Sequence, residues 1–426
     1  MACKGSSNSV VIKPIRRLLA GRGADRAKAA RRRGSAIVLI VLVVVILSSL
    51  GVGLLRLGLS SRIYATRTAH QVEARCAADA GLAKAVFAMN EKLKIKPWSD
   101  GTLPAEADQT LPNCDATFDY TVSVDGGNYT VESVGSLAEA LKSVNGILRL
   151  KGLFESAILT QGPLILKPGM LVDGYNSSDP YDTDVDVKIA TTSTAADQII
   201  LNSGVVVNGD VFVGMDADPS TVIKDLGATT GHQSSLTEEI EFPAVTLPGY
   251  TSPDTTIEAK GVRLPIHPAD SGRYSGISLK RTSDPGILEI TGGDVVLHVT
   301  GNIGMGQDCE IIIDDGSSLT LYVDGDISAD NNAGFNNATQ IPGNLKIYGT
   351  GANQSFDIKA KSDVFGAVYA PNADITIMAN GDVYGSVVAK SFEMKAGGNF
   401  YYDEALSQVT VDDESVRFVV KRWTEQ

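Results

Sequence analysis

The chain has 426 residues, enough for two or three domains, and carries 37 Lys and Arg against 50 Asp and Glu. The formal net charge of −13 argues against nucleic-acid binding by the bulk of the chain, because phosphate contacts need a basic surface. The four cysteines and four histidines are scattered without metal-ligand spacing, which excludes a zinc ribbon and a disulfide scaffold, and we predict neither a metal nor a cofactor.

The chain begins with a basic leader, residues 1–34, which holds ten Lys and Arg and one acid. An uncharged apolar run follows from Ser35 to Leu55, long enough to cross the hydrocarbon core of a membrane as a helix and longer than the core of a secretory signal. The positive-inside rule then places the N-terminus in the cytoplasm and the rest of the chain on the other side. An ordinary single-pass anchor is the plainest interpretation.

The helix is predicted to continue beyond the membrane, because no proline occurs between Arg56 and Lys96. We therefore predict one helix over 35–96, whose first half suits lipid and whose second half suits packing against protein. Apolar or small residues recur every three or four positions in the second half and define the predicted assembly face of the helix. These residues are Val72, Cys76, Ala80, Ala83 and Phe87.

The leader, Gly34, the 35–55 span and the segment from Glu73 to Leu82 resemble the N-terminal region of type IV pilins and pseudopilins, specifically the PilX-like minor pilins. The resemblance implies that prepilin peptidase cuts after Gly34 and makes Ser35 the mature N-terminus. Two residues depart from the major-pilin pattern. Ser35 stands in place of a bulky apolar residue and Leu39 in place of a glutamate, which favours a minor, priming or tip role.

The resemblance also implies partners and a location. The partners would be membrane lipid, prepilin peptidase and other pilin or pseudopilin subunits. The location would be the bacterial inner membrane, with a single span, a cytoplasmic N-terminus and an extracytoplasmic C-terminal part that enters a surface pilus. A type IV pilus and a secretion pseudopilus both remain open as the assembly.

Residues 97–114 are predicted to be a loop, because they are rich in proline, glycine and asparagine. Residues 115–152 are predicted to form a small antiparallel sheet. Alternating segments at 118–124 and 129–134 flank a turn at 125–128, and a third such segment follows at 144–150. A generic hairpin would give the same pattern.

Residues 153–404 are predicted to form a β-solenoid, because a Gly-Asp/Asn-apolar triplet recurs before short β-branched runs. Glycine tolerates the left-handed backbone of tight corners. The triplets begin at Gly209, Gly293, Gly301, Gly325, Gly343, Gly381 and Gly398. A β-sandwich with Gly-Asp turns is the alternative. Residues 405–426 are predicted to be a C-terminal strand or tail.

The segments 363–390 and 399–406 resemble a β-helical domain appended to bacterial PilX-like proteins, and the resemblance extends over 153–423. It implies architecture more than activity. The predicted fold class is therefore mainly β with one long N-terminal α-helix, a small antiparallel sheet and a β-solenoid (β-helix-like) C-terminal domain.

One acidic segment resembles the opening of a calcium loop, with Asp182, Asp184 and Asp186 at alternate positions. An EF-hand needs glycine at the sixth place and glutamate at the twelfth, where this chain has Val187 and Ser193, so that motif is excluded. An irregular calcium site and a solvated acidic loop both remain open.

Catalysis is not predicted, although solenoid enzymes that cleave acidic polysaccharides carry carboxylates beside Arg or Lys on one face. The residues considered for that chemistry are Asp294, Asp314 and Asp315. The predicted function is a non-enzymatic, membrane-anchored minor pilin or pseudopilin that displays its β domain to a surface carbohydrate or protein ligand. The alternatives are a membrane-tethered β-helical carbohydrate-active enzyme and a plain anchored adhesin.

Three cysteines, Cys76, Cys114 and Cys309, are predicted to lie outside the cytoplasm, where disulfides form in many bacteria. Cys114 follows a loop that can reach the helix. Cys76 and Cys114 are therefore the best-placed pair for a bond.

Overall fold

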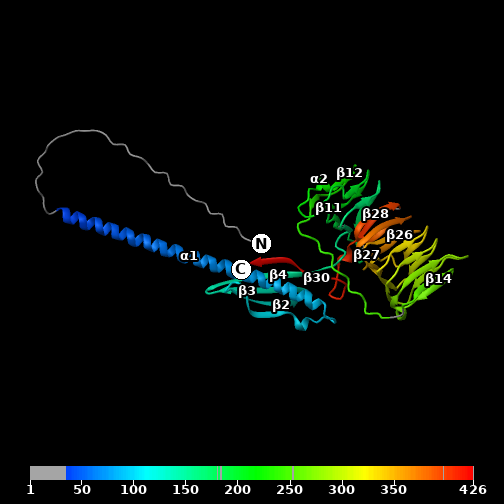
Figure 1. The fold of residues 1–426 in the computed structure, drawn as a ribbon, viewed down its shortest axis with the longest axis horizontal. Coiled ribbons are helices and arrows are strands. Elements are labelled where there is room, and N and C mark those ends of the chain that lie inside the picture. The colour runs from blue at the N-terminus through cyan, green and yellow to red at the C-terminus, as the bar shows by residue number, and fades with distance from the viewer. Residues whose placement is uncertain (1–34, 180, 183–184, 252–253, 397, 426) are drawn as a thin grey trace. The chain divides into compact units, whose positions relative to one another are not determined.

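The structure, a computed structural model, describes residues 35–179, 181–182, 185–251, 254–396 and 398–425. One long helix precedes a mainly β body with antiparallel and parallel sheets, which confirms the predicted fold class at that level (Figure 1). The chain divides into two compact units, Met1–Ala69 and His70–Gln426, and each is described by itself. The leader, with Cys3 and the predicted processing residue Gly34, lies outside the described residues.

The helix α1 spans Ser35–Leu93. Its apolar first part is unburied, and within the described residues it is the one helix long and apolar enough to cross a membrane. It ends three residues before the predicted Lys96. The N–H groups of Lys94 and Ile95 bond to carbonyls three residues back, which tightens the last turn. Pro97 disfavours helical backbone at the residue before it, so the helix stops early.

A five-stranded antiparallel sheet follows α1, in the order β1–β2–β3–β4–β30. Its strands are β1 (Ala105–Thr110), β2 (Thr117–Asp125), β3 (Asn128–Leu137), β4 (Ala140–Lys151) and β30 (Arg417–Glu425), and the 3₁₀ turn η1 (Asp100–Thr102) precedes them. Two of these strands differ from prediction. Residues 97–114 contain β1, where a loop was predicted, and the tail joins the small sheet because β30 pairs with β4. We call residues 70–151 and 417–425 the small module.

Between β4 and β30 the chain forms a stack of parallel strands, which we call the parallel stack (residues 158–403). Its first segment contains β5 (Ile158–Thr160), β6 (Leu164–Leu166), β7 (Leu171–Tyr175), β8 (Val187–Thr191), β9 (Ile199–Leu201), β10 (Val206–Val207), β11 (Gly209–Val213), α2 (Pro219–Val222), β12 (Ile223–Asp225) and β13 (Gln233–Ser235). Its second segment contains β14 (Thr256–Lys260), β15 (Arg263–Ile266), η2 (Pro268–Asp270), β16 (Gly272–Tyr274), β17 (Gly276–Lys280), β18 (Ile287–Ile290), β19 (Asp294–Val299), β20 (Ile303–Met305), β21 (Glu310–Ile313), β22 (Ser318–Val323), β23 (Ile327–Ala329), β24 (Gly334–Asn337), η3 (Pro342–Asn344), β25 (Leu345–Gly349), β26 (Gln354–Ala360), β27 (Val364–Ala379), β28 (Val383–Ala396) and β29 (Phe400–Asp403), and η4 (Glu404–Ser407) follows it.

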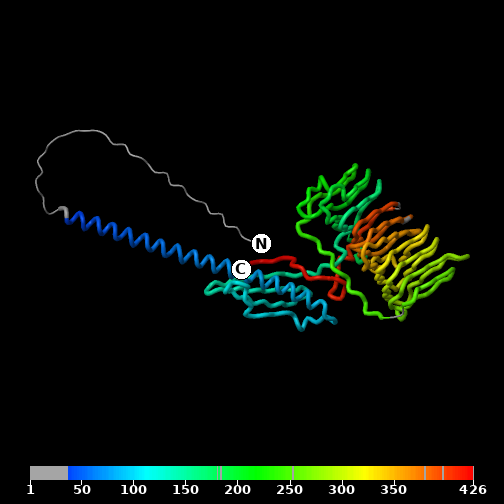
Figure 2. Tube along the Cα trace, viewed as in Figure 1, coloured from blue at the N-terminus to red at the C-terminus, as the bar shows by residue number. Residues whose placement is uncertain are grey.

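The two segments of the stack meet at a seam in its middle. The second segment begins at β14 and proceeds by parallel pairing to β28, which pairs with β5 and β6 of the first segment. In Figures 1 and 2 the red-orange strands therefore lie between the yellow and the green ones. Each strand pairs in parallel with a strand of the next layer, as β14 does with β17 and β17 with β20. The predicted solenoid requires such pairing, and an antiparallel sandwich would lack it. Residues 236–255, which we call the strap, connect β13 to β14.

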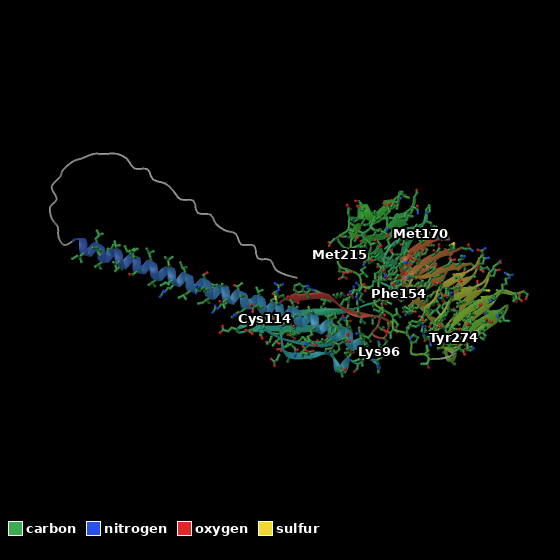
Figure 3. All side chains as sticks on the ribbon, viewed as in Figure 1. Lys96, Cys114, Phe154, Met170, Met215 and Tyr274 are labelled. Atoms are coloured by element: carbon green, nitrogen blue, oxygen red, sulfur yellow. The ribbon has the colours of Figure 1, made fainter. Side chains whose placement is uncertain are left out.

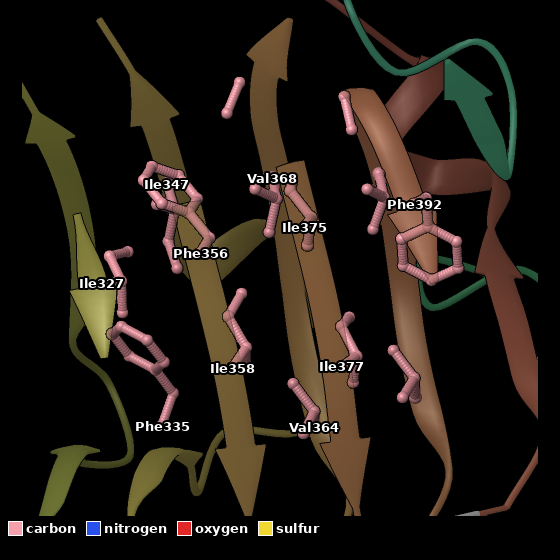
Figure 4. Close-up of a cluster of buried hydrophobic side chains, with 14 of the residues drawn as sticks. Ile327, Phe335, Ile347, Phe356, Ile358, Val364, Val368, Ile375, Ile377 and Phe392 are labelled. Atoms are coloured by element: carbon pink, nitrogen blue, oxygen red, sulfur yellow. The ribbon is translucent and has the colours of Figure 1, made fainter. Parts of the chain in front are cut away.

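The interior of the stack is lined by apolar side chains in register. Ile327 on β23 pairs with Phe356 on β26, and Phe356 pairs with Ile375 on β27. Ile375 pairs in turn with Phe392 on β28, and Phe392 with Leu164 across the seam. All five are at most 1% exposed (Figure 4). A continuous apolar ladder therefore joins the two segments.

Aspartate and asparagine side chains at the corners, including Asp382 and Asn399 of two triplets, bond from one strand layer to the next. Asp363 Oδ1 accepts from the backbone N–H of Asp382 at 2.9 Å, and Asp382 Oδ1 accepts from the N–H of Asn399 at 2.7 Å. Asn399 Oδ1 accepts from the N–H of Leu171 at 3.1 Å, so the chain of bonds crosses the seam. Each side chain satisfies a backbone donor at a corner where strand pairing stops.

The glycine of the triplet leaves room for that side chain. A Cβ on Gly398 would lie 1.8 Å from Asp382 Oδ1, and one on Gly381 would lie 2.0 Å from Asp363 Oδ1. The prediction that these glycines adopt a left-handed backbone is wrong for most of them, because only Gly293 among the triplet glycines has a positive φ. At Gly325, Gly381 and Gly398 the glycine instead leaves space for an Asn or Asp side chain of the preceding layer, whereas Gly209 and Gly301 lie against a backbone carbonyl oxygen.

Candidate functional site

One face of α1 packs against the small sheet through residues with almost no side chain. Ala74, Ala77, Ala78 and Ala85 are fully buried there. The approach is close, because a Cβ on Gly135 of β3 would lie 2.0 Å from the carbonyl oxygen of Ala74 and 2.5 Å from the backbone nitrogen of Ala78. Most of the alanines in this half of the helix therefore serve packing within the chain.

The predicted assembly face lies on the opposite side of the helix. At about 100° per residue, Cys76, Ala83 and Phe87 point away from the buried alanines. Val72 is 55% exposed, Phe87 is 64% exposed, and Cys76 and Ala83 are also exposed. Ala80 is half-buried and packs against the core of the small module, so it lies at the border of the face. The face is apolar, and the sheet leaves it uncovered.

Charged pairs hold both flanks of the helix to the sheet. Arg75 pairs with Glu425 of β30 at 3.1 Å. On the other flank, the Lys84 ammonium pairs with Glu106 and donates to Gln109 Oε1 at 3.0 Å. The hydrogen bond from Lys84 lowers the pKa of Glu106. These half-exposed pairs lie on the two flanks of the helix, between its buried alanines and its exposed face.

An aromatic cluster closes the end of the small module. The rings of Trp98, Tyr129 and Phe418 contact one another, with centroids 4.9 to 5.9 Å apart. Asp100 accepts from Trp98 Nε1 at 2.7 Å and from the Tyr129 hydroxyl at 2.8 Å. These bonds lower the pKa of Asp100. The cluster joins the segment after α1 to β3 and to the C-terminal strand.

The three described cysteines are free, so the predicted bond between Cys76 and Cys114 is not formed. Cys76 is exposed on the helix. Cys114, labelled in Figure 3, has its thiol 3.6 Å from the Glu73 carboxylate. Cys309 is buried in the stack, and that burial raises the pKa of its thiol.

The acidic segment considered for calcium lies beside η4. Asn176 donates to Asp182 at 3.5 Å and to Glu404 at 3.2 Å, and Asp184 lies outside the described residues. Burial, followed by the nearby charge of Asp182, raises the pKa of Glu404. Within the described residues, no group of three or more His, Cys, Asp or Glu is arranged to hold a metal ion.

The carboxylates considered for catalysis do not form one group with basic residues. Asp294 accepts from the Ser318 hydroxyl at 2.7 Å, and Asp314 and Asp315 follow β21 in a turn. A different set, which the sequence analysis missed, gathers on β26, β27 and β28 as three Lys–carboxylate pairs with N–O distances of 3.2 to 3.3 Å. The pairs are Lys359–Asp357, Lys390–Asp374 and Lys395–Glu393. Lys359–Asp357 and Lys395–Glu393 each join residues two apart on one strand, whereas the register of β27 with β28 brings Lys390 to Asp374.

A cavity of about 230 Å³ lies beneath the strap. Phe212, Phe242 and Tyr369 contribute apolar walls, and the Tyr369 hydroxyl donates to the Pro243 carbonyl at 2.8 Å. Lys151 and Glu238, which pair at 3.3 Å, contribute polar walls. Burial raises the pKa of Tyr369.

Comparisons with known proteins add little beyond this geometry. A family profile described as "Domain of unknown function (DUF7305)" matches residues 264–409, less than half of the chain. Among solved structures, the competence-associated pilin ComZ from Thermus thermophilus is similar at 12% identity, over 84% of this chain and 97% of that one. Its TM-score of 0.25 is too low to carry an argument. The comparison with curated proteins gives no match.

Proposed function

We propose that this chain is a membrane-anchored, pilin-like structural protein that carries the parallel stack outside the cytoplasm. The observation that supports it best is that the two parts of α1 differ in what they contact. The apolar first part is unburied, and the second part lays a stripe of alanines on a small antiparallel sheet while an apolar face stays exposed. A helix of this kind serves as an anchor at one end and as a contact for other helices at the other.

The finer proposal is a PilX-like minor pilin or pseudopilin in the inner membrane. Its support is the sequence: a basic leader, Gly34 before the apolar span, and Leu39 where major pilins carry glutamate. The partners would be membrane lipid, prepilin peptidase and other pilin subunits. The stack, as a β-solenoid, would present its surface to a carbohydrate or protein ligand.

The decisive experiment is the mass of the mature N-terminus in cells that contain prepilin peptidase. We expect a chain that begins at Ser35, and we expect Gly34→Leu to block the cut. Gly21→Leu, elsewhere in the leader, is the matched control and should be processed normally. A mature protein that still begins at Met1 in the native host would contradict the pilin proposal and leave a plain anchored adhesin.

The assembly role is tested on the exposed face of α1. We expect Ala83→Trp to reduce recovery in sheared surface filaments, because a large side chain separates neighbouring helices. Membrane levels should stay normal, since the 35–55 span is untouched. Asp125→Trp, at the exposed end of β2, is the control. Equal filament recovery for Ala83→Trp and the wild type would contradict an assembly role for this face.

The three Lys–carboxylate pairs on β26–β28 favour one rival, a membrane-tethered β-helical carbohydrate-active enzyme. Such an enzyme would release products from an acidic polysaccharide, and Glu393→Gln would abolish the release. We expect no turnover by the purified chain. Turnover that the substitution removes would replace the structural role by a catalytic one.

A further inference from the structure

The helix carries a band of positive charge directly after its apolar span. Arg56 follows Leu55, and Arg62 and Arg67 follow at intervals of about 9 and 7 Å along the helix axis. From Ser35 to Val72 the sequence contains neither Asp nor Glu. These three arginines therefore have no carboxylate on their own part of the helix.

The three arginines differ from the basic residues farther along α1. Arg75 and Lys84 pair with Glu425 and Glu106 of the small sheet. Arg56, Arg62 and Arg67 are exposed, and none forms an ion pair with any residue that the structure describes. The charge of the band is therefore available to something outside the chain.

The residues between the arginines indicate the kind of partner. Leu57, Leu59 and Ile63 are 68, 61 and 53% exposed, and Tyr64 is 67% exposed. Tyrosine is enriched where hydrocarbon meets headgroups, and the apolar stems of arginines extend along apolar surface while the charge stays at the interface. A headgroup layer about 5–8 Å thick lies beyond the hydrocarbon core. Arg56 lies at its inner edge and Arg62 near its outer edge. Arg67 lies farther out, but the side chains of a helix tilt toward its N-terminus, which here is the membrane side.

We propose that Arg56, Arg62 and Arg67 form a collar that binds the phosphates of anionic lipid headgroups where α1 leaves the membrane. The proposal rests on the proposed function only in that the 35–55 span crosses a membrane. Guanidinium groups bind phosphate with two parallel N–H···O bonds, which suits arginine better than lysine. Lipid is favoured over a soluble phosphate because the exposed leucines, isoleucine and tyrosine among the arginines require an apolar neighbour.

The test is native mass spectrometry of the full chain in detergent, titrated with phosphatidylglycerol or phosphatidylcholine. We expect Arg62→Gln to weaken phosphatidylglycerol binding about fivefold, and the triple variant Arg56→Gln, Arg62→Gln, Arg67→Gln about a hundredfold. Binding of phosphatidylcholine should not change. The basic leader is present in every variant, so its contribution cancels. Arg75→Gln, which removes an arginine already paired with Glu425, is the matched control.

Three results would overturn the collar: unchanged phosphatidylglycerol binding by the triple variant, an equal loss in Arg75→Gln, or competition by soluble glycerol phosphate at the lipid's own concentration. Lysine at all three positions should keep most of the binding, because the charge remains. Carbonate extraction separates the two proposals. A chain that carbonate removes from membranes contradicts the span, whereas a retained triple variant with normal lipid binding contradicts the collar alone.

Discussion

In both the small module and the parallel stack, glycine leaves space where a Cβ atom would collide with a neighbour. The neighbour that occupies this space differs between the two regions. In the small module, Gly135 lets the backbone of α1 approach the sheet, and the contact is made by alanines. In the stack, Gly398 leaves room for the Asp382 carboxylate, and the contact is a hydrogen bond to the next layer. The first region is held by close apolar packing around one helix, whereas the second repeats a polar corner beside an apolar interior.

The largest expected effect separates the two regions by their cores. We expect Phe418→Ala to destabilise the small module by about 3–5 kcal/mol, because this 1% exposed ring contacts Trp98 and Tyr129. Hydrogen exchange by mass spectrometry should show faster exchange in β3 and β4. Phe356→Ala in the stack is the counterpart and should act on β26 and β27. If either variant loosened both regions equally, the small module and the stack would be one cooperative unit.

Gly135→Ala tests the close helix–sheet contact. The added methyl would meet two backbone atoms of α1, so we expect a cost of about 3 kcal/mol and loss of protection over residues 74–89. Gly101→Ala, where the nearest atom is 3.6 Å from the added Cβ, is the control and should stay near wild type. Equal exchange in both variants would mean that the helix can shift away from the sheet without loss.

The polar corner of the stack predicts a non-additive pair. Asp382→Ala should cost about 2 kcal/mol, because the Asn399 N–H loses a charged acceptor. Gly398→Ala should also destabilise the wild type, since its Cβ would lie 1.8 Å from Asp382 Oδ1. In the Asp382→Ala background that collision is gone, so the second substitution should cost less. Denaturant unfolding of the four proteins measures the difference, and strict additivity would contradict the explanation of the triplet.

The smallest expected effect is a pH dependence of opposite sign in the two regions. The pKa of Asp100 is lowered by hydrogen bonds, so its contribution is complete above its ordinary value of 3.8 and is lost as the pH falls through the folded value. The pKa of Glu404, in η4 directly after the stack, is raised by burial, so this end of the stack gains stability as the pH falls from the folded value towards 4.5. Asp100→Asn should flatten the acid response of Trp98 fluorescence and leave exchange around Glu404 unchanged. If acid lowered the stability around Asp100 and around Glu404 alike, the predicted difference in sign would be contradicted.

The sequence predicted correctly those features that depend on residues close to one another along the chain. The absence of proline predicted nearly the whole of α1, and alternation predicted β2 and β3. The recurrence of Gly with Asp or Asn predicted repeated corners, but the reason for it was not visible, because Asp382 and Gly398 meet only when the layers stack. The Lys390–Asp374 pair was missed for the same reason, whereas Lys359–Asp357 and Lys395–Glu393 are local pairs that only the stacking of β26, β27 and β28 gathers on neighbouring strands.

Two strands and one helix face could not be predicted from sequence, because each depends on residues that are distant along the chain. β1, with the sequence AEADQT, has alanine as its only apolar residue type and joins the sheet only through its pairing with β2. β30 pairs with β4, although all residues of the stack lie between them in sequence. A local sequence pattern cannot predict a pairing over that separation. The alanines of α1 looked alike in sequence, but the sheet buries Ala74 and leaves Ala83 exposed.

The pairing of Arg417 with Lys151 has a consequence for the order of events during synthesis. A ribosome makes β4 long before β30, so the small sheet waits, one strand short and with an open edge, until the stack has been made. A flexible connection of that length would lose much entropy on closing, but a folded stack delivers its two ends already close together. The C-terminal strand therefore joins the sheet last. A chain that stops before Arg417 would complete its stack but leave the small module without its fifth strand.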